Sequence, residues 1–212
     1  MKTKTTTFGD EAAFLKLNAG AVILSDRAGK SKIAVSPKLQ GRVLTSTAAG
    51  DDGLSFGWIN HALILAGKTA EHINAYGGED RFWLGPEGGQ YAIFFKKGAP
   101  FDVEHCFTPA AIDTEPFELI GQVHDRIQMK TNMRLQNYAG TVFDLCVDRE
   151  AALLEFKDAA RLLNIELPAN VSSAAFQTNN RITNTGKTAW NRTTGMLSIW
   201  SLGMFNSSSA AK

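Results

Sequence analysis

With 212 residues, the sequence is long enough to bury a substantial core, as one large domain or as part of a larger one. Its 22 basic and 21 acidic residues give a net charge of +1, which disfavours nucleic acid or an anionic membrane as a partner, because both need a concentrated basic surface. No apolar run approaches the ~20 residues that cross a bilayer, and residues 1–7 hold no apolar signal core. We therefore expect a soluble protein, cytoplasmic or, if a signal was removed, periplasmic or secreted.

Short apolar runs bounded by turn residues predict a mainly β chain in its first half. Residues 10–17 are predicted to form a short helix, because good helix formers precede an Asn-Ala-Gly stop. Residues 101–116 are predicted to be an irregular loop that either walls a cleft or covers the surface. The predicted strands of this half are residues 21–25 and 32–36, which form a hairpin, then 40–47, 81–83 and 91–95.

The second half contains the clearest secondary-structure signal. From Ile127 to Gln136 apolar and polar residues alternate, and residues 143–147 alternate in the same way after an Asn-Tyr-Ala-Gly turn. This pattern predicts an antiparallel hairpin with one buried face. Its outer face would carry Lys130 and Arg134 across from Asp144 and Asp148, as solvated charges rather than a site.

The rest of the chain predicts one more helix and two more strand regions. Residues 155–164 have helical spacing, and residues 171–183 and 195–205 are strand-like. Many strands with few helices indicate an antiparallel β-sandwich. Cys106 and Cys146 are too few for a disulfide framework; they are either buried or idle thiols, or a single bridge.

The segment from His72 to Gln90 concentrates the residue types from which a binding site is built. It holds five glycines, three carboxylates, an asparagine, a histidine, and two aromatic rings beside a guanidinium. Carboxylates and amides bond sugar hydroxyls, and an indole ring covers the apolar face of a sugar. The segment therefore predicts a carbohydrate or other polyol ligand. The candidate binding residues are Arg42, Asn74, Glu79, Asp80, Arg81, Trp83 and His105.

Mutarotation would need one group to take the anomeric proton and another to protonate the ring oxygen. An acid among Glu79, Asp80 and Glu87, with His72 or His105, would supply such a couple, and Glu87 with His72 is the pair we select. Glycosidase chemistry would instead need two carboxylates facing each other across the scissile bond. No metal or cofactor is expected, because the spacing of these residues matches no recognised ligand pattern.

A plainer interpretation of the same residues is purely structural. The segment would be a glycine-rich corner whose Glu79, Asp80 and Arg81 are solvated or paired with one another, since structural ion pairs also collect such residues. Arg42, at a predicted strand start, either points into a cleft or leaves the sheet at its rim. Each histidine would then be a structural or surface residue.

Three groups of motifs occur in the order in which a known superfamily carries them. They are Gly41-Arg42-Val43, then residues 76–83 followed by Gly85-Pro86-Glu87, and finally residues 180–186 before 197–205. Together they resemble the galactose mutarotase-like (aldose epimerase-like) superfamily, most closely an uncharacterised bacterial branch of it.

The resemblance implies a supersandwich of large antiparallel sheets with a concave carbohydrate-binding face lined by Arg42, Arg81, Trp83 and Glu87. Residues 1–212 would be a single β-sandwich domain with one or two short helices, forming an N-terminal part of a larger supersandwich. Mutarotases carry a histidine in the strand that matches residues 197–205, where this chain has none, and their glutamate base comes from a later strand.

These observations leave three functions open. The first is a carbohydrate-binding protein of mutarotase-like fold without assigned catalysis, which is the interpretation we favour. The second is an active carbohydrate isomerase or glycoside hydrolase. The third is a non-catalytic structural or interaction domain. The oligomeric state and the identity of the sugar stay open.

Overall fold

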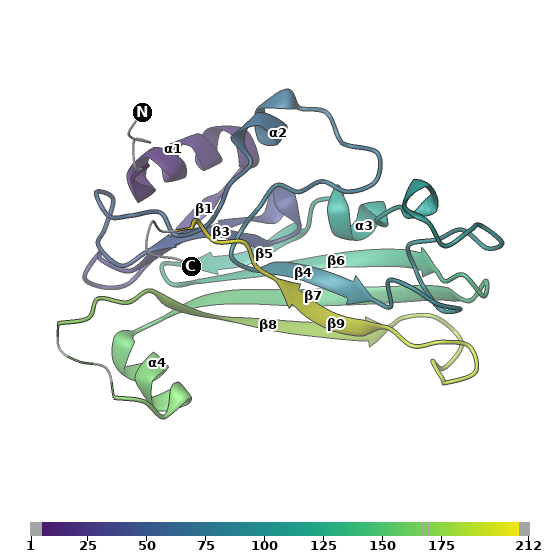
Figure 1. Cartoon of the computed structure of the whole chain (residues 1–212). Coiled ribbons are helices and arrows are strands. Elements are labelled where there is room, and N and C mark those ends of the chain that lie inside the picture. Colours follow the sequence, from purple (N-terminus) through teal and green to yellow (C-terminus); the bar gives the residue numbers. More distant parts are fainter. Residues whose placement is uncertain (1–5, 167, 169, 208–212) are drawn as a thin grey trace.

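The structure is a computed structural model that describes residues 6–166, 168 and 170–207. Within these residues the chain is mainly β, with antiparallel sheets and a few short helices (Figure 1). No helix in the described part of the chain has the length and apolar character needed to cross a membrane.

The N-terminal part is a three-stranded sheet covered by a helix. Strands β1 (Val22–Ser25), β2 (Lys32–Ser36) and β3 (Arg42–Thr47) pair antiparallel in that order, which confirms the predicted hairpin and third strand. Helix α1 (Phe8–Ala19) packs on β2 and β3.

Helix α1 forms where local sequence signals favour it. The Thr7 side chain accepts a hydrogen bond from the backbone N–H of Asp10 at the N-terminus, and Gly20 ends the helix with φ +60°. Phe8, Ala12 and Leu15 recur at helical spacing and are buried against the sheet. The predicted helix over residues 10–17 is therefore confirmed, and it extends slightly at both ends.

Two predicted regions differ from the structure, and one helix forms where the sequence predicted no element. Residues 61–66 form helix α2 (His61–Ala66), and the predicted irregular loop contains helix α3 (Ala110–Asp113) and a 3-10 turn (Val103–His105), so helices are more numerous than expected. Residues 91–95 are not a strand. Their N–H groups make turn bonds, such as Ile93 N–H to Pro86 O (3.1 Å), and their apolar character reflects burial in the core.

The largest sheet is four-stranded, with the order β5 (Glu118–Val123), β6 (Arg126–Gln136), β7 (Val142–Leu154) and β8 (Ala175–Asn184). The alternation seen in the sequence is confirmed, because the odd-numbered residues of β6 from Ile127 face the core, with Met129 and Met133 buried. On the other face the predicted charge pairs occur: Arg134 lies 2.8 Å from Asp144, and Lys130 lies 3.9 Å from Asp148.

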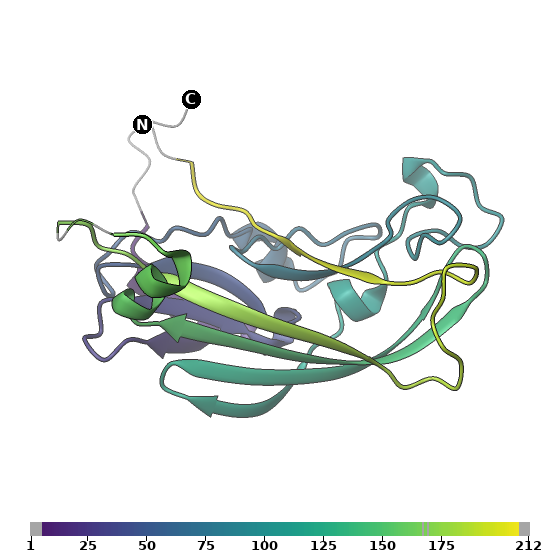
Figure 2. The same ribbon diagram turned by 90° about the horizontal axis from the view of Figure 1, so that it is seen from below.

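A two-stranded sheet lies across the core from this large sheet. Strand β4 (Arg81–Gly85) pairs with β9 (Ser198–Leu202), and Figure 2 shows this pair on one side of the molecule with β5 to β8 on the other. Helix α4 (Phe156–Leu163) follows β7 at one end, close to the predicted residues 155–164. An isolated bridge between Val43 and Asp80 connects β3 to the start of β4.

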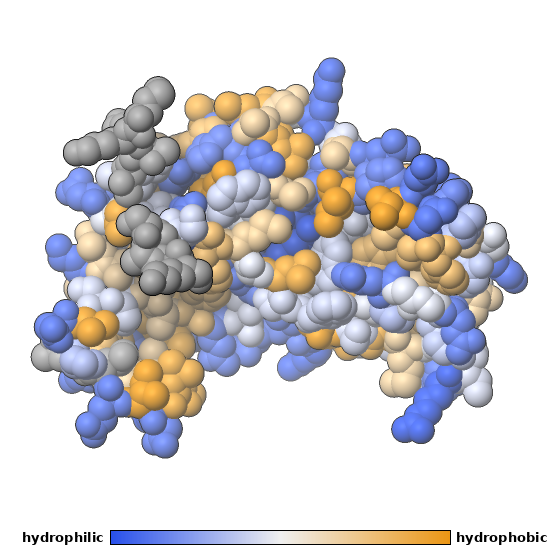
Figure 3. All heavy atoms as spheres, in the orientation of Figure 1, coloured by the Kyte–Doolittle hydropathy of each residue, from blue (hydrophilic) through white to orange (hydrophobic). Residues whose placement is uncertain are grey.

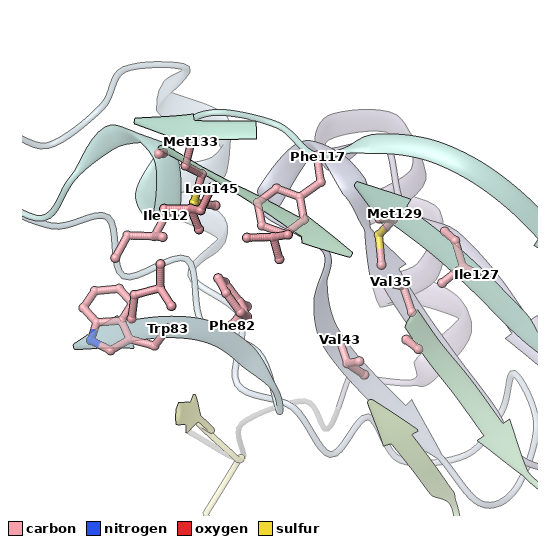
Figure 4. Packing of buried hydrophobic residues seen from close by; sticks show 14 of the residues in the cluster. Val35, Val43, Phe82, Trp83, Ile112, Phe117, Ile127, Met129, Met133 and Leu145 are labelled. Carbon is pink, nitrogen blue, oxygen red and sulfur yellow. The ribbon is translucent and has the colours of Figure 1, made fainter. Parts of the chain in front are cut away.

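The main hydrophobic core fills the space between β4 and the four-stranded sheet. Figure 4 shows Phe82 and Trp83 of β4 near Ile112 of α3 and near Met133 and Leu145 of the large sheet. Both faces of β4 are thus covered, and this strand is buried along its whole length. Cys106 and Cys146 are free thiols, so the single bridge that the sequence left open is not formed.

Candidate functional site

Five of the residues chosen from the sequence belong to buried polar networks. In the first network, Asp113 at the end of α3 accepts a hydrogen bond from Arg81 at 2.6 Å, and the Asn74 side chain donates to the same carboxylate at 2.7 Å. Arg42 donates to the backbone oxygens of Gly77 (3.2 Å) and Asn74 (3.4 Å). Burial lowers the pKa of Arg42 to about 9 and also lowers the pKa of Arg81.

Trp83 continues this network toward the surface. The Arg81 guanidinium lies 4.0 Å from the centre of the Trp83 ring, a cation-π contact. The indole N–H of Trp83 donates to Glu87 Oε1 at 2.6 Å. Contacts connect Arg42, Arg81, Trp83 and Glu87 in one chain, but only Glu87 is exposed, and the other three side chains are enclosed by protein.

Asp80 belongs to a second buried network. Its carboxylate pairs with Arg149 of β7 and accepts a hydrogen bond from the Ser201 hydroxyl of β9. Arg149 also donates to Gly41 O at 2.9 Å and to Asn180 Oδ1 at 2.6 Å. These contacts join the two sides of the molecule, because Asp80 and Arg149 lie on opposite sides of the core.

The two histidines among the candidates occupy separate surface positions. His72 Nδ1 lies 2.8 Å from the carbonyl oxygen of Cys106, so that nitrogen is the donor, and its ring stacks on Phe107. His105 Nδ1 lies 2.6 Å from Asp102. His72 and Glu87 do not hydrogen-bond to each other, because Glu87 Oε1 accepts the hydrogen bond from the Trp83 indole and His72 Nδ1 donates to the Cys106 carbonyl. Neither His72 nor Glu87 lines either of the two cavities described below.

The geometry therefore separates the sequence candidates into two groups. The side chains of Asn74 and Asp80 and the Nη2 group of Arg81 bond to protein partners, and these residues, like Arg42 and Trp83, are closed off from solvent. The Nε atoms of Arg42 and Arg81 are buried with no hydrogen-bond partner among the described residues. In this structure the contacts of Arg81 and Asp80 connect the start of β4 to α3 and to β7. The structural interpretation fits them better than ligand binding does, and Glu79 is the candidate that lines a cavity.

The two glycines before Glu79 determine where its side chain lies. Gly77 and Gly78 have φ values of +92° and +107°, a region that glycine enters easily. This backbone path brings the chain against β3, where the N–H of Glu79 donates to Val43 O at 2.8 Å. Glu79 Oε1 then accepts hydrogen bonds from the Ser46 N–H (2.7 Å) and hydroxyl (3.0 Å).

The cavity beside Glu79 has a volume of about 700 Å³. It lies between β3, the end of β7, α4, the start of β8 and the segment that follows β9. Hydrophobic residues over α4 lie on the surface at the lower left in Figure 3. The lining side chains include a carboxylate, a hydroxyl, two amides and three phenyl rings: Glu79, Ser46, Gln177, Asn206, Phe56, Phe176 and Phe205.

Glu79 is the chemically distinctive member of this lining. Its side chain is almost entirely buried, and burial raises the pKa of the Glu79 carboxyl, although the two hydrogen bonds from Ser46 partly oppose this. No described residue donates to its second oxygen, Oε2. A desolvated carboxyl group at the wall of a cavity is a frequent feature of binding and catalytic sites.

A second hollow, of about 630 Å³, lies on the outer face of the four-stranded sheet. Glu150 accepts hydrogen bonds from Gln128, Asn179 and Arg126, which lower its pKa, and Lys130 lies 3.9 Å from Asp148. This agrees with the sequence expectation of a solvated charged face, and we do not select it as the site.

Sequence reasoning missed most residues of the selected cavity. Ser46 lies in the predicted strand over residues 40–47, but nothing in that segment of the sequence marks it as the partner of Glu79. Phe56 and Phe205 are 149 residues apart in the chain, and the bridge between Gly57 and Phe205 brings them together. Nor does the sequence around Asp113 and Arg149 indicate that these residues pair with the buried Arg81 and Asp80.

The fold and site together define a mainly β protein with a partly apolar cavity built around a buried glutamate. The chain belongs to DUF6786, a family of unknown function, whose model matches residues 6–212. No curated protein and no solved structure matches the chain.

Proposed function

We propose that this protein binds a carbohydrate or a similar polyol in the cavity around Glu79. The observation that carries the proposal is the composition of the wall, where a buried carboxylate and two amides lie among three phenyl rings. Carboxylate and amide groups bond several hydroxyls at once, and phenyl rings cover the apolar C–H face of a sugar. The volume of about 700 Å³ falls in the range of small-molecule sites.

We propose binding rather than turnover as the primary function. Mutarotation needs an acid and a base on opposite sides of the anomeric centre. Glu79, with its raised pKa, suits the acid, but no second titratable side chain lines the cavity among the described residues. An isomerase or hydrolase function would need a further group.

The proposed architecture is a β-sandwich of galactose mutarotase-like type. Its support is the order of the Gly-Arg, Gly-Gly-Glu-Asp-Arg-Phe-Trp and Asn-Thr-Gly motifs, together with two antiparallel layers that enclose one core. In this proposal residues 76–83 serve two purposes: Arg81 and Trp83 stabilise the packing of the layers, and the Glu79 carboxylate faces the ligand.

Calorimetric titration with a panel of hexoses tests the proposed function. We expect at least one hexose to bind, and we expect Phe205→Ala to weaken that binding roughly three- to tenfold, because an aromatic contact contributes ~0.5–1.5 kcal/mol beyond its area. Phe205 is well exposed, so its removal should leave the fold intact.

Phe101→Ala is the matched control, because Phe101 is another exposed aromatic residue and lies outside the cavity. It should leave sugar affinity unchanged. If no hexose binds the folded protein at millimolar concentration, or if both variants weaken binding equally, the proposed site is wrong, and a structural or interaction role becomes the better interpretation.

A further inference from the structure

The charges around the cavity are strongly asymmetric. Among its described lining residues Glu79 has the only ionisable side chain, and no lysine, arginine or histidine is present. The nearest described hydrogen-bond donors to its carboxylate are the neutral N–H and hydroxyl of Ser46, both on Oε1. Two other buried acids have cationic partners: Asp113 pairs with Arg81, and Asp80 pairs with Arg149.

A buried carboxylate without a cationic partner is costly to keep ionised, since it has lost its hydration without gaining a counter-charge. A ligand that supplies a positive group at Oε2 would remove that cost. The same group would form a charge-assisted hydrogen bond, which is about twice as strong as a neutral one. An anionic ligand would instead place a second negative charge beside the Glu79 carboxylate, with no cation among the lining residues to offset it.

We infer that the preferred ligand of the Glu79 cavity is an amino sugar with a free ammonium group, and that uronic acids and sugar phosphates are rejected. The ammonium would pair with Glu79, and the neutral hydroxyls would bond Gln177, Asn206 and Ser46. The phenyl rings of the wall would cover the sugar's apolar face. This inference rests on the proposed carbohydrate-binding function and names its ligand class.

Matched sugar sets test the inference by calorimetric titration at neutral pH. Each set contains a neutral hexose, its 2-amino form, its N-acetylated 2-amino form and its uronate, in the gluco and galacto series. The amino sugar is expected to bind about tenfold tighter than the neutral parent. The N-acetylated sugar fills the same position without the charge and should lose this preference, and the uronate should bind more weakly than the parent.

Glu79→Gln removes the negative charge of residue 79 while nearly preserving the shape of its side chain. The amide retains an acceptor for the Ser46 donors and can still bond a hydroxyl, so neutral-sugar affinity should change only a few-fold while the amino-sugar preference falls to near unity. Glu104→Gln, an exposed carboxylate outside the cavity, is the control and should keep the preference. Circular dichroism of both variants checks that they are folded.

The possible failures are distinguishable. If neutral hexoses bind and the amino forms bind no tighter, the inference is overturned while the proposed function stands. The same conclusion follows if the preference survives in Glu79→Gln. If no sugar of any set binds the folded protein, the proposed function and the inference both fall.

Discussion

Asp113→Ala is expected to lower the free energy of unfolding by about 3–5 kcal/mol, because removing one partner leaves the other charge buried and unpaired. Asp113 neutralises Arg81 at 2.6 Å and also accepts hydrogen bonds from the backbone and side chain of Asn74. Arg42 lies close enough for its charge to interact with both Arg81 and Asp113. Chemical denaturation of the wild type and the variant measures the effect.

Asp144→Ala is the matched control for this experiment. Asp144 also pairs with an arginine, Arg134, at 2.8 Å, but both side chains are exposed, and such pairs contribute at most ~1 kcal/mol. In the double variant Arg81→Met with Asp113→Ala, the loss should be smaller than the sum of the two single losses. Equal small losses for Asp113→Ala and Asp144→Ala would contradict the role we assign to the buried network.

Gly77→Ala is expected to lower the free energy of unfolding by about 2–5 kcal/mol, from left-handed backbone strain and forced displacement of neighbouring atoms. Gly77 has φ +92°, and a Cβ placed there would lie 2.1 Å from the carbonyl oxygen of Trp58. That oxygen belongs to the backbone and accepts a hydrogen bond from Gly78 N–H, so it cannot move away freely.

Two other glycines of the same segment distinguish backbone strain from the displacement of neighbouring atoms. Gly89 has φ +82° but open space around its Cβ position, so Gly89→Ala should show the backbone strain alone, about 1–2 kcal/mol. Gly88 has open space and no positive φ, so Gly88→Ala should be neutral or slightly stabilising, by up to ~1 kcal/mol. If Gly77→Ala lowered the free energy of unfolding no more than Gly89→Ala does, the close approach of residue 77 to Trp58 would not explain the need for glycine there.

Local patterns in the sequence were sufficient to predict most strands. The alternation from Ile127 to Gln136 has period two over ten residues, and an antiparallel strand with one buried face is its simplest physical explanation. The stop after α1 was equally clear, because Gly20 takes the left-handed conformation that ends the helix. The prediction of a strand over residues 91–95 was wrong, because a buried segment is apolar whatever its backbone conformation.

The site was harder to predict because its partners are distant in the chain. The composition of residues 72–90 shows which polar and aromatic side chains are present, but it does not distinguish a side chain in a buried ion pair from one that contacts a ligand. That distinction depends on Asp113 and Arg149, which pair with Arg81 and Asp80 from 32 and 69 residues away. Glu79 lacks such a cationic partner among the described residues, and only tertiary structure reveals this difference between neighbouring acids.

Amide chemical shifts recorded by NMR during titration with a hexose and its 2-amino form would locate the ligand. We expect the shifts to concentrate at Ser46, Glu79, Gln177 and Asn206, and the buried residues Arg81 to Trp83 to move little. Shifts centred on Glu87, His72 and His105, or on the outer face of the four-stranded sheet, would contradict binding in the Glu79 cavity, and so would a spectrum that no sugar changes.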